Sequence, residues 1–263
     1  MHIAVCIKQV PDTKNVRIDP DTHTLVRQGV ESIINPFDLF AVEGALKIKD
    51  ESGARVTVMT MGPPQAEEAL REVLSRGVDE AVLLSDRAFA GSDTWATSMT
   101  LSAAIRKLGD VDLIFCGKQA IDGDTAQVGP ELATLLDIPY ATFVKKIEKL
   151  DDQNLKVTRQ TDDGVEVWKL PTPALITVIK EMGEPRLPSL RHKMRAKKAQ
   201  IPVWGIADLG LDANDVGLCG SFTQVVRVFS PPRRSDQILI TGSIEEQVEQ
   251  LFSYLKEAKV PGV

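Results

Sequence analysis

One loop carries the residues best suited to holding a ligand: Gly117-Lys-Gln-Ala-Ile-Asp-Gly-Asp-Thr-Ala-Gln-Val128. Its two glycines let the backbone approach a ligand closely, and the unpaired amides that open the following helix favour an anion such as phosphate. Asp122 and Asp124 would repel that phosphate, so they fit better as helix caps or as acceptors for ribose hydroxyls. A simpler loop that only caps a helix is equally consistent with these residues.

Two further segments could line the same site. Asn35-Pro-Phe-Asp38 has an N-cap residue, Pro at the first helical position and an acidic first turn, so it indicates a helix start and only secondarily a ligand wall. Thr94 and Thr97 open another helix and could donate hydroxyls to a phosphate, although Asp93 reads equally well as a plain cap. Ligands of parallel sheets bind beyond the carboxyl ends of the strands. The loops that follow strand candidates are Gln9–Thr13, Gly62–Pro64 and Gly117–Val128.

Other chemistries have little support. The cysteines and histidines are scattered: Cys6, Cys116, Cys219, His2, His23 and His192. They form no metal-ligand spacing and no nucleophile–base set, and Cys6 and Cys116 lie in apolar runs typical of core thiols. Neither the dinucleotide fingerprint nor the P-loop is present. We therefore expect no catalytic residue and no metal ligand, so a bound cofactor would supply any redox or group-transfer chemistry.

Composition limits the partners. The chain has 263 residues, with 31 Lys and Arg against 37 Asp and Glu, and its formal net charge of −6 argues against nucleic acid. Three sparse cysteines fit a reducing compartment. The sequence opens directly on a strand pattern and has no apolar run long enough to span a membrane. These features predict a cytoplasmic protein without membrane insertion.

The elements that must position these loops alternate between strand and helix up to about residue 140. Nearly continuous apolar runs predict buried parallel strands at Ile3–Lys8, Arg55–Met61, Glu80–Ser85 and Val111–Gly117. Capping patterns predict helices from Pro36 to Gly53, from Pro64 to Gly77, over 93–108 and over 125–136. The alternation predicts an α/β fold with a doubly wound, mostly parallel sheet. A hairpin is expected within residues 16–30.

The pattern changes after Pro139. Strand patterns at 143–150, 155–160 and 165–170 are joined by turns, which predicts an antiparallel insertion over 143–170, and Ala174–Lys180 could return to the sheet. We therefore expect an α/β domain over 1–182. Residues 183–263 lack regular periodicity and predict an extended arm for a partner, ending in an amphipathic helix over 243–259.

The arm begins with a run of basic residues. From Arg186 to Lys198 there are six Lys and Arg and no acidic residue. The run could be a solvated face, a nucleic-acid contact or a surface for an acidic protein. Missing aromatic residues disfavour nucleic acid, and Leu190 and Met194 would add apolar contacts to a protein interface.

Over essentially the whole chain, these motifs in this order resemble the β subunit of electron-transfer flavoprotein. The matching segments are Ala4–Lys8, Asn35-Pro-Phe37 with Ala41-Val-Glu43, Met61-Gly-Pro63, Gly117–Val128, Glu184-Pro-Arg186 and Lys193–Lys198. The resemblance implies an adenine-nucleotide-binding, Rossmann-like subunit that pairs with an FAD-carrying α subunit.

The resemblance also implies site residues. The cofactor-binding set, completed by the two threonines above, is Cys6, Asn35, Pro36, Phe37, Asp38, Met61, Thr94, Thr97, Gly117, Lys118, Gln119, Ala120, Ile121, Asp122, Gly123, Asp124, Thr125, Ala126, Gln127 and Val128. Residues 186–198 resemble the family's recognition loop for an acyl-CoA dehydrogenase. Its docking residues here are Leu190, Arg191, Lys193, Met194, Arg195, Lys197 and Lys198.

The family has two branches. In one, the β subunit holds a structural AMP and the heterodimer relays electrons; in the other, it holds a second FAD and accepts hydride from NADH. Gln9–Thr13, Asp38 and Asp122–Pro130 resemble the second, bifurcating branch. This implies a redox electron carrier that oxidises NADH only within the heterodimer and reduces ferredoxin or flavodoxin and an acyl-CoA dehydrogenase-type partner. The alternatives are an AMP-holding β subunit, a stand-alone ATP-binding protein, or an interaction subunit without nucleotide.

Overall fold

The computed structural model describes residues 1–12, 17–18, 25–26, 32–149, 151, 153–226 and 238–260. Two compact units are present, Met1–Arg227 and Val228–Val263. The first unit contains every candidate ligand-binding residue.

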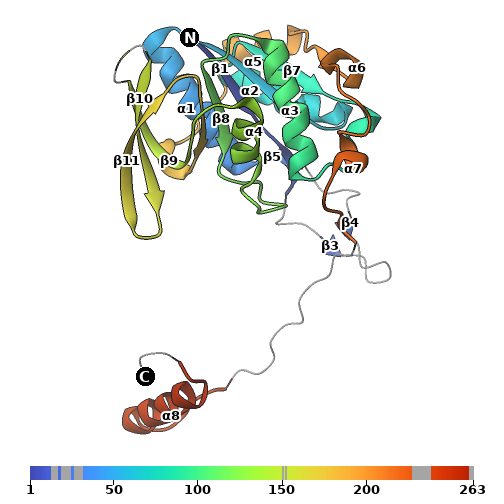
Figure 1. The fold of residues 1–263 in the computed structure, drawn as a ribbon. Coiled ribbons are helices and arrows are strands. Elements are labelled where there is room, and N and C mark those ends of the chain that lie inside the picture. Colours follow the sequence, from blue (N-terminus) through green and yellow to red (C-terminus); the bar gives the residue numbers. More distant parts are fainter. Residues whose placement is uncertain are drawn as a thin grey trace. The chain divides into compact units, whose positions relative to one another are not determined.

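A nine-stranded sheet, within the described residues, forms the centre of the first unit, in the order β11-β10-β9-β12-β8-β1-β6-β7-β13 (Figure 1). The strands from β9 to β13 in that order are parallel. Their bounds are β9 Tyr140–Lys149, β12 Ala174–Val178, β8 Leu113–Gly117, β1 His2–Cys6, β6 Arg55–Met61, β7 Glu80–Leu84 and β13 Val203–Trp204. The predicted α/β fold with a mostly parallel sheet is confirmed.

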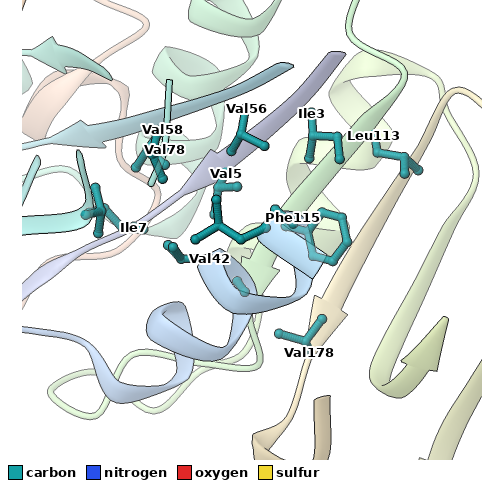
Figure 2. Close-up of a cluster of buried hydrophobic side chains, with 14 of the residues drawn as sticks. Ile3, Val5, Ile7, Val42, Val56, Val58, Val78, Leu113, Phe115 and Val178 are labelled. Atoms are coloured by element: carbon teal, nitrogen blue, oxygen red, sulfur yellow. The ribbon is translucent and has the colours of Figure 1, made fainter. Parts of the chain in front are cut away.

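Helices cover both faces of this sheet, as double winding requires. Side chains alternate between the faces along each strand, so Ile3 and Val5 pack into one apolar cluster while Ala4 and Cys6 pack into the other. The first cluster lies beneath α1 Pro36–Ser52 and α2 Glu67–Arg76, and Figure 2 shows Val42 of α1 against Val5 and Phe115. The second lies beneath α3 Thr94–Leu108 and α4 Val128–Leu136.

The helix boundaries agree with the capping patterns except at α4. α1 begins at Pro36 and is capped by Gly53. The short 3₁₀ turn η2 Pro64–Ala66 leads into α2, which is capped by Gly77. We expected the fourth helix to begin near Thr125, but it begins at Val128. Asp124 and Ala126 have φ values of 57° and 56°, which an α-helix does not tolerate, so the preceding residues stay in the loop.

The predicted antiparallel insertion is present and extends the same sheet. β10 Asn154–Thr161 pairs antiparallel with β9 and with β11 Gly164–Pro171, and β12 returns between β9 and β8. The first predicted strand ends earlier than expected, at Cys6, and Gln9–Pro11 forms β2, which pairs with β5 Ser32–Ile34. β3 Arg17–Ile18 and β4 Leu25–Val26 pair as the expected hairpin; the rest of 16–30, like Thr13, lies outside the described residues.

Residues 183–226 are more ordered than their sequence suggests. They form α5 Leu190–Lys198, α6 Ile206–Leu209 and α7 Gly217–Gly220, and β13 pairs with β7 at the edge of the sheet. We expected the arm to begin at residue 183, but the chain divides after Arg227. Residues 183–226 form short elements that pack on the first unit, and such elements leave no long period in the sequence.

The second unit contains α8 Ile244–Glu257, where we expected a helix over 243–259. The Ser243 hydroxyl accepts a hydrogen bond from the Glu246 amide, and the Glu246 carboxylate accepts one from the Ser243 amide, so the predicted capping box is present. In the described part of the chain, no helix combines the length and apolar character needed to cross a membrane.

Candidate functional site

The candidate site lies at the carboxyl ends of β1, β6 and β8. These strands end at Cys6, Met61 and Gly117, and Cys6 lies in register with Cys116. In the sheet, β6 and then β7 lie on one side of β1, whereas β8 and then β12 lie on the other side of β1. The strand order thus reverses between β1 and β8, and such a switch point is where doubly wound sheets bind ligands.

Asp38 joins the two strands at this switch point. Its Oδ2 accepts a hydrogen bond from the Lys8 amide at 2.7 Å, and its Oδ1 accepts one from the Gly117 amide at 3.2 Å. Burial raises the pKa of Asp38 to about 7, although bonds from Asn35 and from the two amides oppose the rise. The predicted cofactor contact Asp38 is therefore buried and bound to backbone, where it fixes the geometry of the strand ends.

Gly117 is required by the close approach of α1. A Cβ at this position would lie 2.3 Å from Asp38 Oδ1 and 2.7 Å from the carbonyl carbon of Phe37. Any side chain would therefore separate β8 from the first turn of α1. The neighbouring Gly123 differs, because nothing lies within 4 Å of its ideal Cβ.

Asn35 fixes the Gly117–Val128 loop rather than capping α1. Its side chain makes no cap hydrogen bond. Instead, Asn35 Nδ2 donates to the Gln119 carbonyl at 2.8 Å, and Asn35 Oδ1 accepts from the Ile121 amide at 3.2 Å. Because Asn35 is 1% exposed, this amide acts as an internal bracket for the loop.

Lys8 is a site residue that the sequence reasoning missed. Its ammonium donates to both carboxylate oxygens of Asp122 at 2.8 Å. This pair ties the middle of the loop to the end of β1 and cancels one of the two charges that would repel a phosphate. The only available sequence signal was the position of Lys8 directly after an apolar run.

The remainder of the loop is open. Residues 122–125 are exposed, and the Gln119 side-chain amide donates to Asp124. Gln127 precedes α4 without making a side-chain cap bond. The first amides of α4 are therefore not capped by that side chain, which suits an anion at this helix end.

The threonines of α3 lie beside α4. Thr94 Oγ1 donates to Glu131 at 3.1 Å and to the Gln127 side-chain oxygen at 3.4 Å. Thr97 lies one turn further along α3 and is half-buried. Asp93 is the cap, as expected, because its carboxylate accepts from the Ala96 amide at 3.0 Å.

Lys118 lies between two aromatic rings at the start of the loop. Its ammonium is 5.9 Å from the Phe37 ring centroid and 5.4 Å from that of Phe143, and its amide donates to the Val178 carbonyl. Phe143 has a φ of 56° within β9, where the register of pairing with β12 shifts. These cation–π contacts hold the ammonium at the same end of the sheet as the site.

The two site cysteines are buried thiols. Hydrogen bonding to Cys6, burial and the nearby charges raise the pKa of Cys116, so its thiol stays protonated. Met61 is half-buried at the end of β6. These three residues belong to, or pack against, the apolar cluster beneath α3 and α4.

The predicted docking residues lie on α5. Leu190 and Met194 are 77% and 58% exposed. Among the described residues, no carboxylate forms an ion pair with Arg191, Lys193, Arg195, Lys197 or Lys198. Arg186 behaves differently, because its guanidinium binds Glu43 at 2.9 Å and Asp50 at 2.8 Å and so belongs to the fold.

Two hollows in the described part of the chain lie away from this site. One, of about 450 Å³, is lined by His2, Arg55 and Asp112 at the amino ends of the strands. The other, of about 460 Å³, lies between α1 and β9. Neither contains the loop residues, so we place the candidate site by topology and polar geometry. No cluster of His, Cys, Asp and Glu among the described residues could hold a metal ion.

Comparison with known proteins identifies the family. The family model described as electron transfer flavoprotein domain matches residues 22–209. The caffeyl-CoA reductase-Etf complex subunit CarD of Acetobacterium woodii is 52% identical over 99% of this chain and 100% of its own length. The electron transfer flavoprotein subunit beta of Thermoanaerobacterium thermosaccharolyticum is 50% identical over 99% and 100%, and the protein FixA of Bradyrhizobium diazoefficiens is 45% identical over 99% and 93%. The chain therefore belongs to the electron transfer flavoprotein β-subunit family.

Proposed function

We propose that this chain binds FAD at the carboxyl ends of β1, β6 and β8 and accepts hydride from NADH within a heterodimer with an electron-transfer flavoprotein α subunit. One electron would then go to ferredoxin or flavodoxin and the other, through the α-subunit FAD, to an acyl-CoA dehydrogenase-type partner. The observation that carries the proposal is the bracketed Gly117–Val128 loop at the switch point between β1 and β8.

The residues present fit an adenine nucleotide. The loop is held from beneath by Asn35, Asp38 and Lys8, while residues 122–125 remain exposed to a ligand. Amides at the start of α4 would face the phosphates, and the pairing of Asp122 with Lys8 reduces the local repulsion. Asp124 would accept from ribose hydroxyls. FAD is the group that would supply the redox chemistry at this site, because the thiols of Cys6 and Cys116 are buried and the raised pKa of Cys116 keeps it protonated.

The open position at Gly123 favours the larger cofactor. A carboxylate side chain there would add charge beside the pyrophosphate of FAD, and glycine avoids this. The Gly123 Cβ position is unobstructed, so its effect on a ligand can be tested without disturbing the fold. An AMP-holding subunit is the second candidate.

The name of one relative supports a reductase partner. That relative is a subunit of a caffeyl-CoA reductase-Etf complex. The cations of α5, which form no ion pair within the described residues, have Leu190 and Met194 among them and would suit an acidic surface with an apolar centre on such a partner.

The test compares Gly123→Glu with Gly123→Gln in the heterodimer. Both variants add nearly the same volume to open space, but only glutamate adds charge. We expect Gly123→Glu to lower β-site FAD occupancy at least tenfold and to abolish bleaching of the β-site flavin by NADH, while Gly123→Gln retains most of both. Equal flavin content in the two variants would contradict the role of this loop. A wild-type heterodimer that NADH does not bleach would favour the AMP candidate.

A further inference from the structure

Asp38 is a carboxylate that the proposed function leaves without a ligand contact. It is 6% exposed, and both of its oxygens accept from backbone amides at the ends of β1 and β8. Among the described residues, no ion pair within 4.0 Å neutralises it. The Lys8 ammonium, whose charge acts on Asp38, is bound to Asp122 instead.

The groups that face Asp38 come from each element packed against it. β8 contributes the Cys116 thiol, whose raised pKa keeps it neutral, and the end of β1 contributes Lys8. The neutral Asn35 directly precedes α1, and the loop contributes Asp122 through its pair with Lys8. The negative charge of Asp38 is therefore balanced mainly by amide dipoles in a buried place, where the energy of that charge responds strongly to a second anion nearby.

We propose that Asp38 is a proton-linked positioning residue, which clips Gly117 to the first turn of α1 and takes up a proton when the phosphates of a nucleotide bind to the Gly117–Val128 loop. The inference rests on the proposed function, since it needs a phosphate-bearing ligand at this loop. It goes beyond that function, because it assigns a proton to the binding step.

The two hydrogen bonds that Asp38 accepts from backbone amides differ in length, and this difference indicates which oxygen takes up the proton. Oδ2 lies 2.7 Å from the Lys8 amide nitrogen, whereas Oδ1 lies 3.2 Å from the Gly117 amide nitrogen. The weaker bond marks Oδ1 as the oxygen that takes the proton. Solvent supplies one proton, the carboxylate becomes a carboxylic acid, and no bond in the ligand changes.

The experiment uses the heterodimer with its α-subunit FAD retained and the β-site nucleotide removed. Calorimetric titration with ADP-ribose, in two buffers of different ionisation enthalpy, measures the protons taken up on binding. ADP-ribose carries pyrophosphate oxygens that do not titrate near pH 7, and adenosine is the uncharged control. We expect about half a proton to be taken up at pH 7 with ADP-ribose and none with adenosine. The affinity for ADP-ribose should fall about threefold to fivefold from pH 7 to pH 8.

The Asp38→Asn variant should bind ADP-ribose without proton uptake and with no pH dependence. If that variant does not fold, infrared difference spectra of the wild-type heterodimer labelled with [4-¹³C]aspartate provide the second readout. ADP-ribose should then produce the carbonyl band of a protonated aspartic acid, and Asp122→Asn should retain that band. Proton uptake that survives Asp38→Asn, or nucleotide binding without uptake or band, would overturn the inference. Failure of both ADP-ribose and adenosine to bind would instead reject the proposed nucleotide site.

Discussion

The switch point and the α5 helix use polar residues in opposite ways. At the switch point, Asn35 and Asp38 are buried, and they hold the loop and the strand ends through hydrogen bonds to backbone groups. On α5, Lys193 and Lys197 are exposed, and no ion pair within the described residues uses their charges. The contrast shows which polar residues shape this molecule and which remain available to another one.

The physical reason is the cost of burial. A buried amide or carboxylate is tolerated only when its hydrogen bonds are made, so such groups hold neighbouring segments at fixed distances. An exposed lysine costs little wherever it lies and acts mainly through the charge it presents to a partner. Substitutions at the switch point should therefore alter stability and nucleotide binding together, whereas substitutions on α5 should alter docking alone.

The largest effect should come from Gly117→Ala. Its Cβ would overlap the first turn of α1, so we expect a loss of about 3 kcal/mol in the free energy of unfolding and loss of nucleotide binding. Gly123→Ala in the same loop meets open space and should leave both nearly unchanged. Chemical denaturation measures the stability of the two variants, and nucleotide extraction measures their nucleotide content. Similar losses in both variants would contradict the distinction between the two glycines.

The second largest effect should come from removing the Asn35 side chain, which brackets the loop. Asn35→Ala leaves the Gln119 carbonyl and the Ile121 amide without their partner, and we expect a loss of about 2 kcal/mol with a weakened affinity for nucleotide. Asn214→Ala, which removes an exposed amide whose hydrogen bond within the described residues goes to Asp212, is the control and should cost much less. Equal costs for the two amides would mean that burial of Asn35 has no special role.

The pH dependence of stability follows from Asp38. Its folded-state pKa is raised from 3.8 to about 7, so the folded protein holds more protons than the unfolded chain between these values. Stability should therefore fall as pH rises through this window, by about 2 kcal/mol from pH 5 to pH 7 for this group. The difference between wild type and Asp38→Asn, measured by denaturation at each pH, isolates the contribution. A difference that does not vary with pH would contradict the raised pKa.

The smallest effect on the molecule itself should come from α5. Charge reversal by Lys197→Glu with Lys198→Glu should weaken docking of the dehydrogenase-type partner about tenfold at low salt, by loss of electrostatic attraction. Stability should change by less than about 0.5 kcal/mol. Binding measured across a salt series checks this result, with the double variant Lys156→Glu and Lys169→Glu on the distant β10 and β11 as the charge-matched control. A loss of nucleotide in the α5 variant would erase the contrast between the two regions.

The sequence predicted the fold where one period dominates a long segment. The buried strands ending at Cys6, Met61 and Gly117 were readable as apolar runs, and the Pro and Gly signals located α1 and α2. The start of α4 was misplaced because nothing in Asp124 or Ala126 signals a positive φ. β13 has only two residues, and its pairing with β7 depends on contacts that no local pattern encodes.

The candidate site was predicted as a set of residues but not as an arrangement. The Gly117–Val128 loop was evident from its glycines and carboxylates. The roles of Asn35 and Asp38 were not evident, because the local sequence is the same whether these side chains cap a helix or bind a distant loop and strand ends. Lys8 was missed since its partner Asp122 lies far along the chain. Such pairings follow from the strand order, which brings β1 beside β8.

The central claim is that the switch-point site holds FAD, and the most direct measurement is the nucleotide content of the purified heterodimer. Acid extraction followed by chromatography separates FAD from AMP and counts each per heterodimer. We predict two FAD and no AMP, with one FAD lost in Gly117→Ala. One FAD together with one AMP, or one FAD and no second nucleotide, would contradict the claim.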